Sequence, residues 1–200
     1  MTFQTYIGSG IVTIFEPLAR LRIAVFREFP YLYEGSLAYE TTYLETYANS
    51  ARAMVFAVFN GPALIGATTC LPLRDETAEV QAPFIREGYD LDSVFYFGES
   101  LLLPTYRGQG LGHRFFDERE AHVRAFGAYL TTTFCAVQRP ANHPLRPGRG
   151  TAADYRPHDA FWHNRGYTPN PALQTTFSWP DLGETADSEK VMQFWTRSLT

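Results

Sequence analysis

The sequence is poor in cysteine and has no long apolar run. It contains two cysteines, Cys70 and Cys135, among 200 residues, too few for the disulfide framework of a small secreted domain. It also lacks the stretch of about 18 apolar residues that a membrane-spanning helix requires. The first residues show no basic leader of the kind that opens a signal peptide. We therefore expect a reduced, cytoplasmic protein that does not partner with a membrane.

An excess of positive charge is missing as well. Lysine and arginine number 17 against 21 acidic residues, which gives a net charge of -4 and a pI near 5.7. This balance gives no electrostatic reason to expect nucleic acid as a partner. The chain is 45% hydrophobic and 16% aromatic, enough for a sizeable core, and 200 residues is about the length of one domain. We predict a single domain over residues 1–200.

Several catalytic signatures are absent. The glycines at 108, 110 and 112 match neither the Walker A loop nor the dinucleotide pattern G-x-G-x-x-G. No G-x-S-x-G elbow is present, which argues against an α/β-hydrolase. The five histidines show no metal-ligand spacing, so we predict no metal site.

The first half of the chain alternates helical and strand-like patterns. Apolar residues at helical spacing predict a helix over 15–29, ended by Pro30, and the later part of the tyrosine-rich stretch 31–50 fits a second helix. Two β-rich runs flank Asn60-Gly61, which predicts a hairpin. Residues 72–93 read as an irregular connection that crosses the surface.

The second half contains a strand–helix–strand unit over about 94–137. Its short links predict a crossover between parallel strands. On a helical wheel the apolar residues share one side, and the charged residues fall opposite: Leu111, Phe115, Phe116, Val123 and Phe126 against Arg114, Asp117, Glu118, Glu120 and Arg124. A long proline- and arginine-rich loop (138–157), a short helix and two strand-like runs that form an antiparallel hairpin complete the chain. The fold class is therefore α/β (α+β), with a mixed sheet flanked by helices.

One stretch, "GESLLLPTYRGQGLG" (residues 98–112), places glycines where a buried strand gives way to a helix. The first N–H groups of a helix have no intrahelical partner, and the helix dipole adds partial positive charge there. Glycines let a phosphate approach these amides closely. The stretch predicts an anion site, although the same spacing also fits a turn that only packs.

This stretch resembles the acyl-CoA signature of the GNAT superfamily of N-acetyltransferases, R/Q-x-x-G-x-G/A. Arg107, Gly110 and Gly112 meet it. The leading leucines with Pro104 and the ending "FWHNRGY" of the late helix are also similar to that family. The resemblance covers about residues 50–200, and the first fifty residues fit it loosely.

The resemblance implies a GNAT-like fold and acetyl-CoA, or another acyl-CoA, as co-substrate. It implies that backbone amides of about 108–113 cradle the diphosphate, that the motif strand pairs with the pantetheine arm, and that a strand amide polarises the thioester carbonyl. The cofactor-binding residues it implies are Leu101, Leu102, Leu103, Arg107, Gly108, Gln109, Gly110, Leu111, Gly112 and His113.

Acyl transfer to an amine needs a base, and the departing thiolate calls for a proton. Glu99 lies on the motif strand where family members often carry a glutamate, and we predict it as the base; the alternative is a glutamate that only pairs with an arginine or orients substrate. The tyrosine that usually serves as acid is replaced by Trp162, and an indole N–H is no useful acid. We name Tyr155 and His158 as substitutes, or else coenzyme A leaves as a thiolate.

Three further features have two interpretations each. Cys135 is interpreted as a buried strand cysteine rather than a covalent nucleophile. The loop arginines Arg139, Arg146, Arg149 and Arg156 either form a lid over phosphates or only keep the loop solvated. The tyrosines between residues 31 and 47 either line the acceptor pocket or pack in the core.

We conclude from the sequence that the protein moves an acetyl or short acyl group from coenzyme A directly to a small-molecule or peptide amine. A homodimer is compatible with this reading. The alternatives are a non-catalytic acyl-CoA-binding module, which the missing tyrosine favours, and an acyltransferase-fold protein whose acceptor is not an amine.

Overall fold

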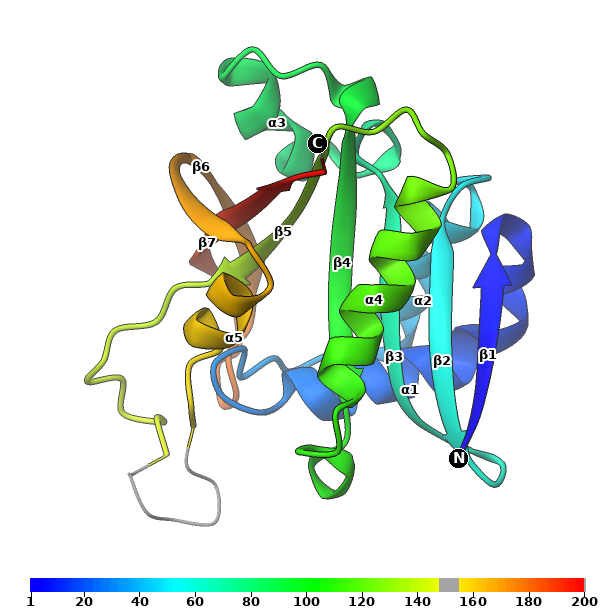
Figure 1. Ribbon diagram of the computed structural model, residues 1–200. Coiled ribbons are helices and arrows are strands. Elements are labelled where there is room, and N and C mark those ends of the chain that lie inside the picture. The colour runs from blue at the N-terminus through cyan, green and yellow to red at the C-terminus, as the bar shows by residue number, and fades with distance from the viewer. Residues whose placement is uncertain (148–154, 200) are drawn as a thin grey trace.

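A computed structural model describes residues 1–147 and 155–199 (Figure 1). One seven-stranded sheet runs through these residues in the order β1-β2-β3-β4-β5-β7-β6. Its neighbours are antiparallel except for β4 and β5, which are parallel. The strands are β1 (Thr2–Ile7), β2 (Met54–Asn60), β3 (Ala63–Pro72), β4 (Val94–Leu102), β5 (Thr131–Val137), β6 (Thr168–Trp179) and β7 (Ser188–Ser198).

Helices cover both faces of the sheet. On one face α4 (Leu111–Arg124) packs on β2, β3 and β4, while α1 (Phe15–Phe26) packs on β3 and β4 from the other face. The remaining helices are α2 (Leu37–Ala48), α3 (Ala78–Arg86) and α5 (Asp159–Asn164). Each face has its own apolar core: Leu18, Leu44 and Tyr96 belong to one, and Phe97 and Phe115 to the other.

The predicted fold class is confirmed, with its mixed sheet, its parallel crossover through α4 and its C-terminal antiparallel hairpin. The hairpin at Asn60-Gly61 is present as β2 and β3, and Gly61 has φ +57°. The first helix stops at Phe26, a turn earlier than the pattern predicts, and Arg27 to Pro30 lie outside it. The second helix begins after Ser36, whose hydroxyl accepts the Tyr39 N–H at 3.3 Å as an N-cap.

Two predictions about packing are wrong. Residues 72–93 contain a helix, α3, because Val80 and Phe84 are spaced one turn apart and both are buried; the polar residues between them and Pro83 conceal this pattern. Glu120 was expected on the solvent face of α4 but is 3% exposed. Its carboxylate accepts hydrogen bonds from Arg165 at 2.9 Å and Arg197 at 2.8 Å, which attach the C-terminal part of the chain to α4.

Candidate functional site

A gap opens between the two parallel strands. β4 pairs with β5 at Val94 to Tyr96 opposite Thr131 to Thr133. Pairing then stops, although β4 continues to Leu102 and β5 continues beside β7 to Val137. The strands diverge toward the end where α4 begins, as Figure 1 shows. One main-chain edge of β4 is therefore left without a neighbouring strand, and an extended ligand can bind to such an edge.

The loop between β4 and α4 supplies the anion-binding features at the open end of this gap. Gly108 and Gly110 have φ +76° and +81°, and a Cβ at either position would meet nothing within 4 Å. Gly110 is the N-cap of α4, and no side chain caps the helix there. The amides of the first turn are thus available to an anion. These features suit the binding of an anion, and the assignment of the loop as a diphosphate cradle stays a prediction.

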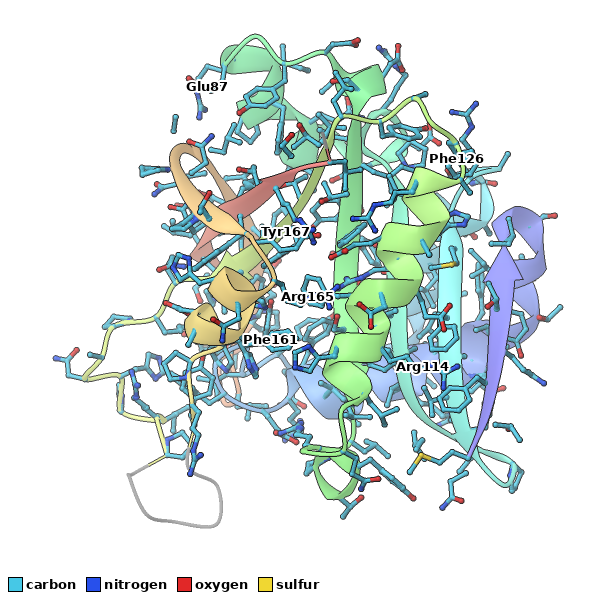
Figure 2. The ribbon with its side chains drawn as sticks, viewed as in Figure 1. Glu87, Arg114, Phe126, Phe161, Arg165 and Tyr167 are labelled. Atoms are coloured by element: carbon cyan, nitrogen blue, oxygen red, sulfur yellow. The ribbon has the colours of Figure 1, made fainter. Side chains whose placement is uncertain are left out.

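The other residues of the loop hold the cradle in place. The Arg107 guanidinium donates to the Leu102 carbonyl at 3.1 Å and to Glu28 at 2.8 Å, so this half-exposed side chain fixes the end of β4. A Cβ on Gly112 would lie 3.7 Å from the Phe161 ring. The His113 ring also packs against Phe161, with centroids 4.8 Å apart. Figure 2 shows Phe161 and Arg165 on the α5 side, from which the Phe161 ring packs on Phe116 of α4 and Arg165 donates to Glu120 of α4 at 2.9 Å.

Only some of the predicted strand amides face the gap. The Leu103 N–H donates to the Ile65 carbonyl at 3.0 Å. Because hydrogen-bonded and non-hydrogen-bonded pairs alternate along antiparallel strands, the register of β3 on β4 also turns the Leu101 main chain toward β3. The same register turns the main-chain N–H groups of Ser100 and Leu102 toward the gap. Ser100 is a site residue that sequence reasoning missed, since the alternation depends on the register.

A β-bulge interrupts β4 next to the gap. Thr68 is opposite Ser100 and Cys70 is opposite Phe97, so Thr69 faces both Gly98 and Glu99. The Glu99 N–H donates to the Thr69 hydroxyl at 3.2 Å. A Cβ on Gly98 would lie 1.9 Å from the Tyr47 phenol oxygen, so glycine is required there. The bulge fixes the direction in which Glu99 leaves the strand.

The Glu99 carboxylate is buried in an ion-paired triad. Glu99 is 7% exposed and accepts a hydrogen bond from Arg22 of α1, which also bonds Glu40 of α2. Burial lowers the pKa of Arg22, but the two carboxylates more than offset this, and its pKa lies well above the usual value. The guanidinium also lies 4.3 Å from the centroid of the Tyr43 ring. The pairing with an arginine, named above as the alternative for Glu99, is present in the fold.

A third buried carboxylate, that of Glu76, lies near the triad. Burial raises the pKa of Glu76 from 4.5 to about 7. The Tyr43 phenol donates to Glu76 at 3.4 Å and lies 3.3 Å from the Tyr47 phenol, which is the group that abuts Gly98. Glu76 also lines a cavity of about 330 Å³ with Asp75. Sequence reasoning missed this series of contacts from Glu76 through Tyr43 and Tyr47 to the bulge, because the turn after β3 has no recognisable motif.

Cys135 is a buried thiol. Its sulfur lies 3.2 Å from the Tyr96 phenol oxygen, and burial raises its pKa to about 12. At neutral pH it is therefore protonated and a poor nucleophile. The interpretation as a buried strand cysteine is confirmed. Cys70 is likewise buried and free.

Trp162 and the two substitute acids, Tyr155 and His158, make none of their ring contacts with the ion-paired triad. Tyr155 packs against Phe29 at 4.8 Å between ring centroids, and the His158 ring packs against Trp162 at 5.7 Å. Burial, and then the nearby Arg107, lower the pKa of His158. None of these contacts involves Glu99, so the assignment of Tyr155 or His158 as an acid stays a prediction.

Arg139 has a structural role that neither interpretation of the loop anticipated. Its guanidinium makes two hydrogen bonds to Asp181, at 2.7 and 2.8 Å, and donates to the carbonyls of Pro30 and Tyr31 at 2.8 Å. It clamps the α1–α2 connection to the turn between β6 and β7. Arg146 lies over the Phe29 and Tyr155 rings. Arg149 lies outside the described residues.

Within residues 1–147 and 155–199, no helix has both the length and the apolar character needed to cross a bilayer. The same residues contain no group of three or more histidine, cysteine or acidic side chains arranged to hold a metal ion.

Comparison with known proteins gives matches in structure alone. No family model matches the chain, and no curated protein matches it in sequence. An aminoglycoside 6'-N-acetyltransferase crystallised with coenzyme A is 13% identical, with a TM-score of 0.59 over 100% of this chain and 98% of its own. An acetyltransferase from Streptococcus agalactiae is 13% identical, with a TM-score of 0.59 over 98% of each chain.

A third structure connects the fold to a named family. It is a GNAT-family protein from Desulfovibrio desulfuricans, 9% identical, with a TM-score of 0.55 over 100% of this chain and 99% of its own. All three matches extend over nearly the whole of both chains, including the first fifty residues that the sequence motifs did not cover. The chain therefore has the fold of the GNAT acetyltransferases.

Proposed function

We propose that the protein transfers an acetyl or short acyl group from acyl-CoA to an amine, directly and within a ternary complex. The observation that carries this proposal is the gap between β4 and β5, with the uncapped start of α4 at its open end. A protein of the same fold has been crystallised with coenzyme A. Direct transfer agrees with the protonated state of the Cys135 thiol, which leaves no activated nucleophile on β5.

The site residues take the following roles in this proposal. Amides from Gly110 to His113 bind the diphosphate at the helix N-terminus. The Ser100 main chain and the Leu102 N–H pair with the pantetheine arm, as an added strand would. The Ser100 N–H, next to the bulge, polarises the thioester carbonyl in the manner of an oxyanion hole.

The amine must lose a proton, and two carboxylates are candidates to accept it. Glu99 is at the bulge, with Arg22 as its counter-charge. Glu76 has its pKa near 7, which suits a base that works at neutral pH. We propose that Glu99 orients the acceptor amine, and that Glu76 takes up the proton through the Tyr43 and Tyr47 phenols. For the departing sulfur, Tyr155 and His158 are the candidate acids, and departure of coenzyme A as a thiolate is the alternative.

The non-catalytic acyl-CoA-binding module stays the second candidate because Trp162 occupies the usual position of the acid. Its indole ring packs on Phe134 and Trp195 at centroid distances of 5.1 and 5.0 Å. In the module the same gap would bind acyl-CoA without turnover.

Thiol release from acetyl-CoA with a panel of amines separates the two candidates. An enzyme releases thiol only when an amine is present, and Glu99→Gln slows that release. A module binds acetyl-CoA and releases nothing with any amine. If no coenzyme A derivative binds, both candidates are wrong.

The cradle can be tested with a matched pair of glycines. Gly110 and Gly88 both have positive φ and open space around a Cβ, so alanine at either should cost about 1–2 kcal/mol of stability through backbone strain. Only Gly110→Ala disturbs the amides at the α4 N-terminus. We expect it to weaken coenzyme A binding at least tenfold, measured by calorimetry, because the free energy of about one charge-assisted hydrogen bond is lost. Equal affinities for Gly110→Ala and Gly88→Ala would contradict the proposed cradle.

A further inference from the structure

Arg119, near the middle of α4, is buried, and no residue in the described part of the chain forms an ion pair with it. It is 2% exposed and is the largest fully buried side chain in the described residues. Its guanidinium lies 4.4 Å from the centroids of both the Phe97 and Phe116 rings. One nitrogen, Nη1, donates to the Glu99 carbonyl at 3.3 Å, while Nε and Nη2 are buried with no hydrogen-bond partner. Burial lowers the pKa of Arg119 to about 10, so it still carries its charge at neutral pH.

The fold does not explain this charge. Glu120, the next residue along α4, pairs with Arg165, Arg197 and Arg124 rather than with Arg119. The Glu99 carbonyl already accepts the Thr68 hydroxyl at 2.7 Å. An apolar side chain of similar volume could fill the space between Phe97 and Phe116 without the desolvation penalty of a buried ion. Unpaired buried N–H groups are rare in folded proteins, and a catalytic role is one of the reasons for which they are kept.

The place of Arg119 indicates what that partner is. Phe97 is the first residue of β4 beyond the last β4–β5 pair, and Glu99 is in the bulge. The guanidinium contacts both from the α4 face of the sheet, so it lies beside the point where the pairing of β4 with β5 ends. It is nine residues after Gly110, about 13 Å along α4 at 1.5 Å per residue. A ligand held by its diphosphate at Gly110 and running along β4 brings its far end toward Arg119.

We propose that Arg119 is a further catalytic residue, whose free N–H groups bind the sulfur of coenzyme A as it becomes a thiolate. The inference rests on the proposed acyl transfer. The amine nitrogen bonds to the thioester carbon, the C–S bond breaks, and its electron pair goes to sulfur. The ammonium proton passes to a carboxylate of the site. The thiolate leaves the reaction paired with the guanidinium and takes a proton from solvent on release, so the position of Trp162 needs no acid.

Binding of coenzyme A compared with desulfo-coenzyme A tests this role without turnover. Calorimetry from pH 6 to 9 should show wild-type protein increasingly preferring coenzyme A as pH rises, about tenfold for each unit by which Arg119 lowers the thiol pKa. In Arg119→Met this pH-dependent preference should be lost, and the rate of acyl transfer should fall about 100-fold, as for loss of one oxyanion donor. Affinity for desulfo-coenzyme A should stay within about threefold by the same measurement.

Arg124→Met is the matched control, because Arg124 is the exposed arginine at the end of the same helix. It should behave as wild type in both measurements. Arg119→Met should keep or raise the melting temperature, whereas a purely structural arginine would lower it. An unchanged pH preference in Arg119→Met overturns the inference. If Arg119→Met does not fold, Arg119→Lys replaces it, because lysine keeps the charge on a shorter side chain. Arg119→Lys should reduce the pH-dependent preference for coenzyme A over desulfo-coenzyme A. A wild-type preference in this variant overturns the inference as well. Failure of wild-type protein to bind either compound instead overturns the proposed function.

Discussion

Replacing Arg22 by methionine is expected to lower the free energy of unfolding by about 3–5 kcal/mol, the usual effect of removing one partner from a buried ion pair. The substitution leaves the carboxylates of Glu40 and Glu99 buried without their shared cation. Urea denaturation at pH 7.5 measures the change.

Two further variants make this result specific. Arg20 lies on the same helix but pairs with Glu16 at the surface, with side chains 61% and 72% exposed, so Arg20→Met should change stability by less than about 0.5 kcal/mol. Adding Glu40→Gln and Glu99→Gln to Arg22→Met removes the stranded charges and should recover most of the lost stability. If Arg22→Met were as mild as Arg20→Met, the triad would not hold α1 and α2 to the bulge as we describe.

The sequence predicted the elements whose signals are local. The turn at Asn60-Gly61, the helix from Leu111 and the strands beside it follow from residues close together in the chain. α3 was missed because a nine-residue helix with three buried residues, one of them Pro83, gives a weak periodic signal. The pairing of β7 with β5 was also beyond reach, since the place of β7 between β5 and β6 depends on a contact between distant segments.

The same division holds for the candidate site. The glycines at the start of α4 were predicted from the motif, and their geometry suits an anion. The partners of Glu99 were not predictable, because Arg22 is 77 residues away in the chain and reads as one of three arginines on an amphipathic helix. Arg119 was missed for a related reason: a charged residue in a helix is normally expected at the surface.

Wild-type protein is expected to lose free energy of unfolding as the pH rises from about 4.5 through 7, and replacing Glu76 by glutamine should remove this loss. In the folded protein Glu76 has a pKa of about 7, whereas the same carboxyl ionises near 4.5 when it is free of burial. Between these pH values the folded protein holds a proton that the unfolded chain has released. The stabilising contribution is therefore complete below about pH 4.5 and is lost as the pH rises through 7. At about 1.4 kcal/mol per pH unit, the loss is about 3 kcal/mol.

The groups that face this carboxylate account for the direction. Burial dominates, the Thr77 N–H and the Tyr43 phenol favour the ionised form, and the negative charge of Glu99 opposes it against the weaker attraction of Arg22. The Tyr47, Tyr96 and Cys135 groups lie in the same electrostatic environment. No cation in the described residues pairs directly with Glu76. Burial therefore disfavours its ionised form, and the carboxylate takes up a proton near neutral pH.

Wild-type protein and Glu76→Gln should therefore differ in two profiles. The free energy of unfolding of wild type relative to Glu76→Gln should fall by about 3 kcal/mol between pH 4.5 and 7.5. The rate of acyl transfer by wild type should rise with pH through about 7, as Glu76 becomes able to accept a proton, and this rise should be absent in Glu76→Gln. Glu79→Gln, at an exposed position three residues away, is the control and should follow wild type in both. A rise in rate near pH 7 that survives in Glu76→Gln would exclude Glu76 as the proton acceptor, even if the stability profile changed as expected.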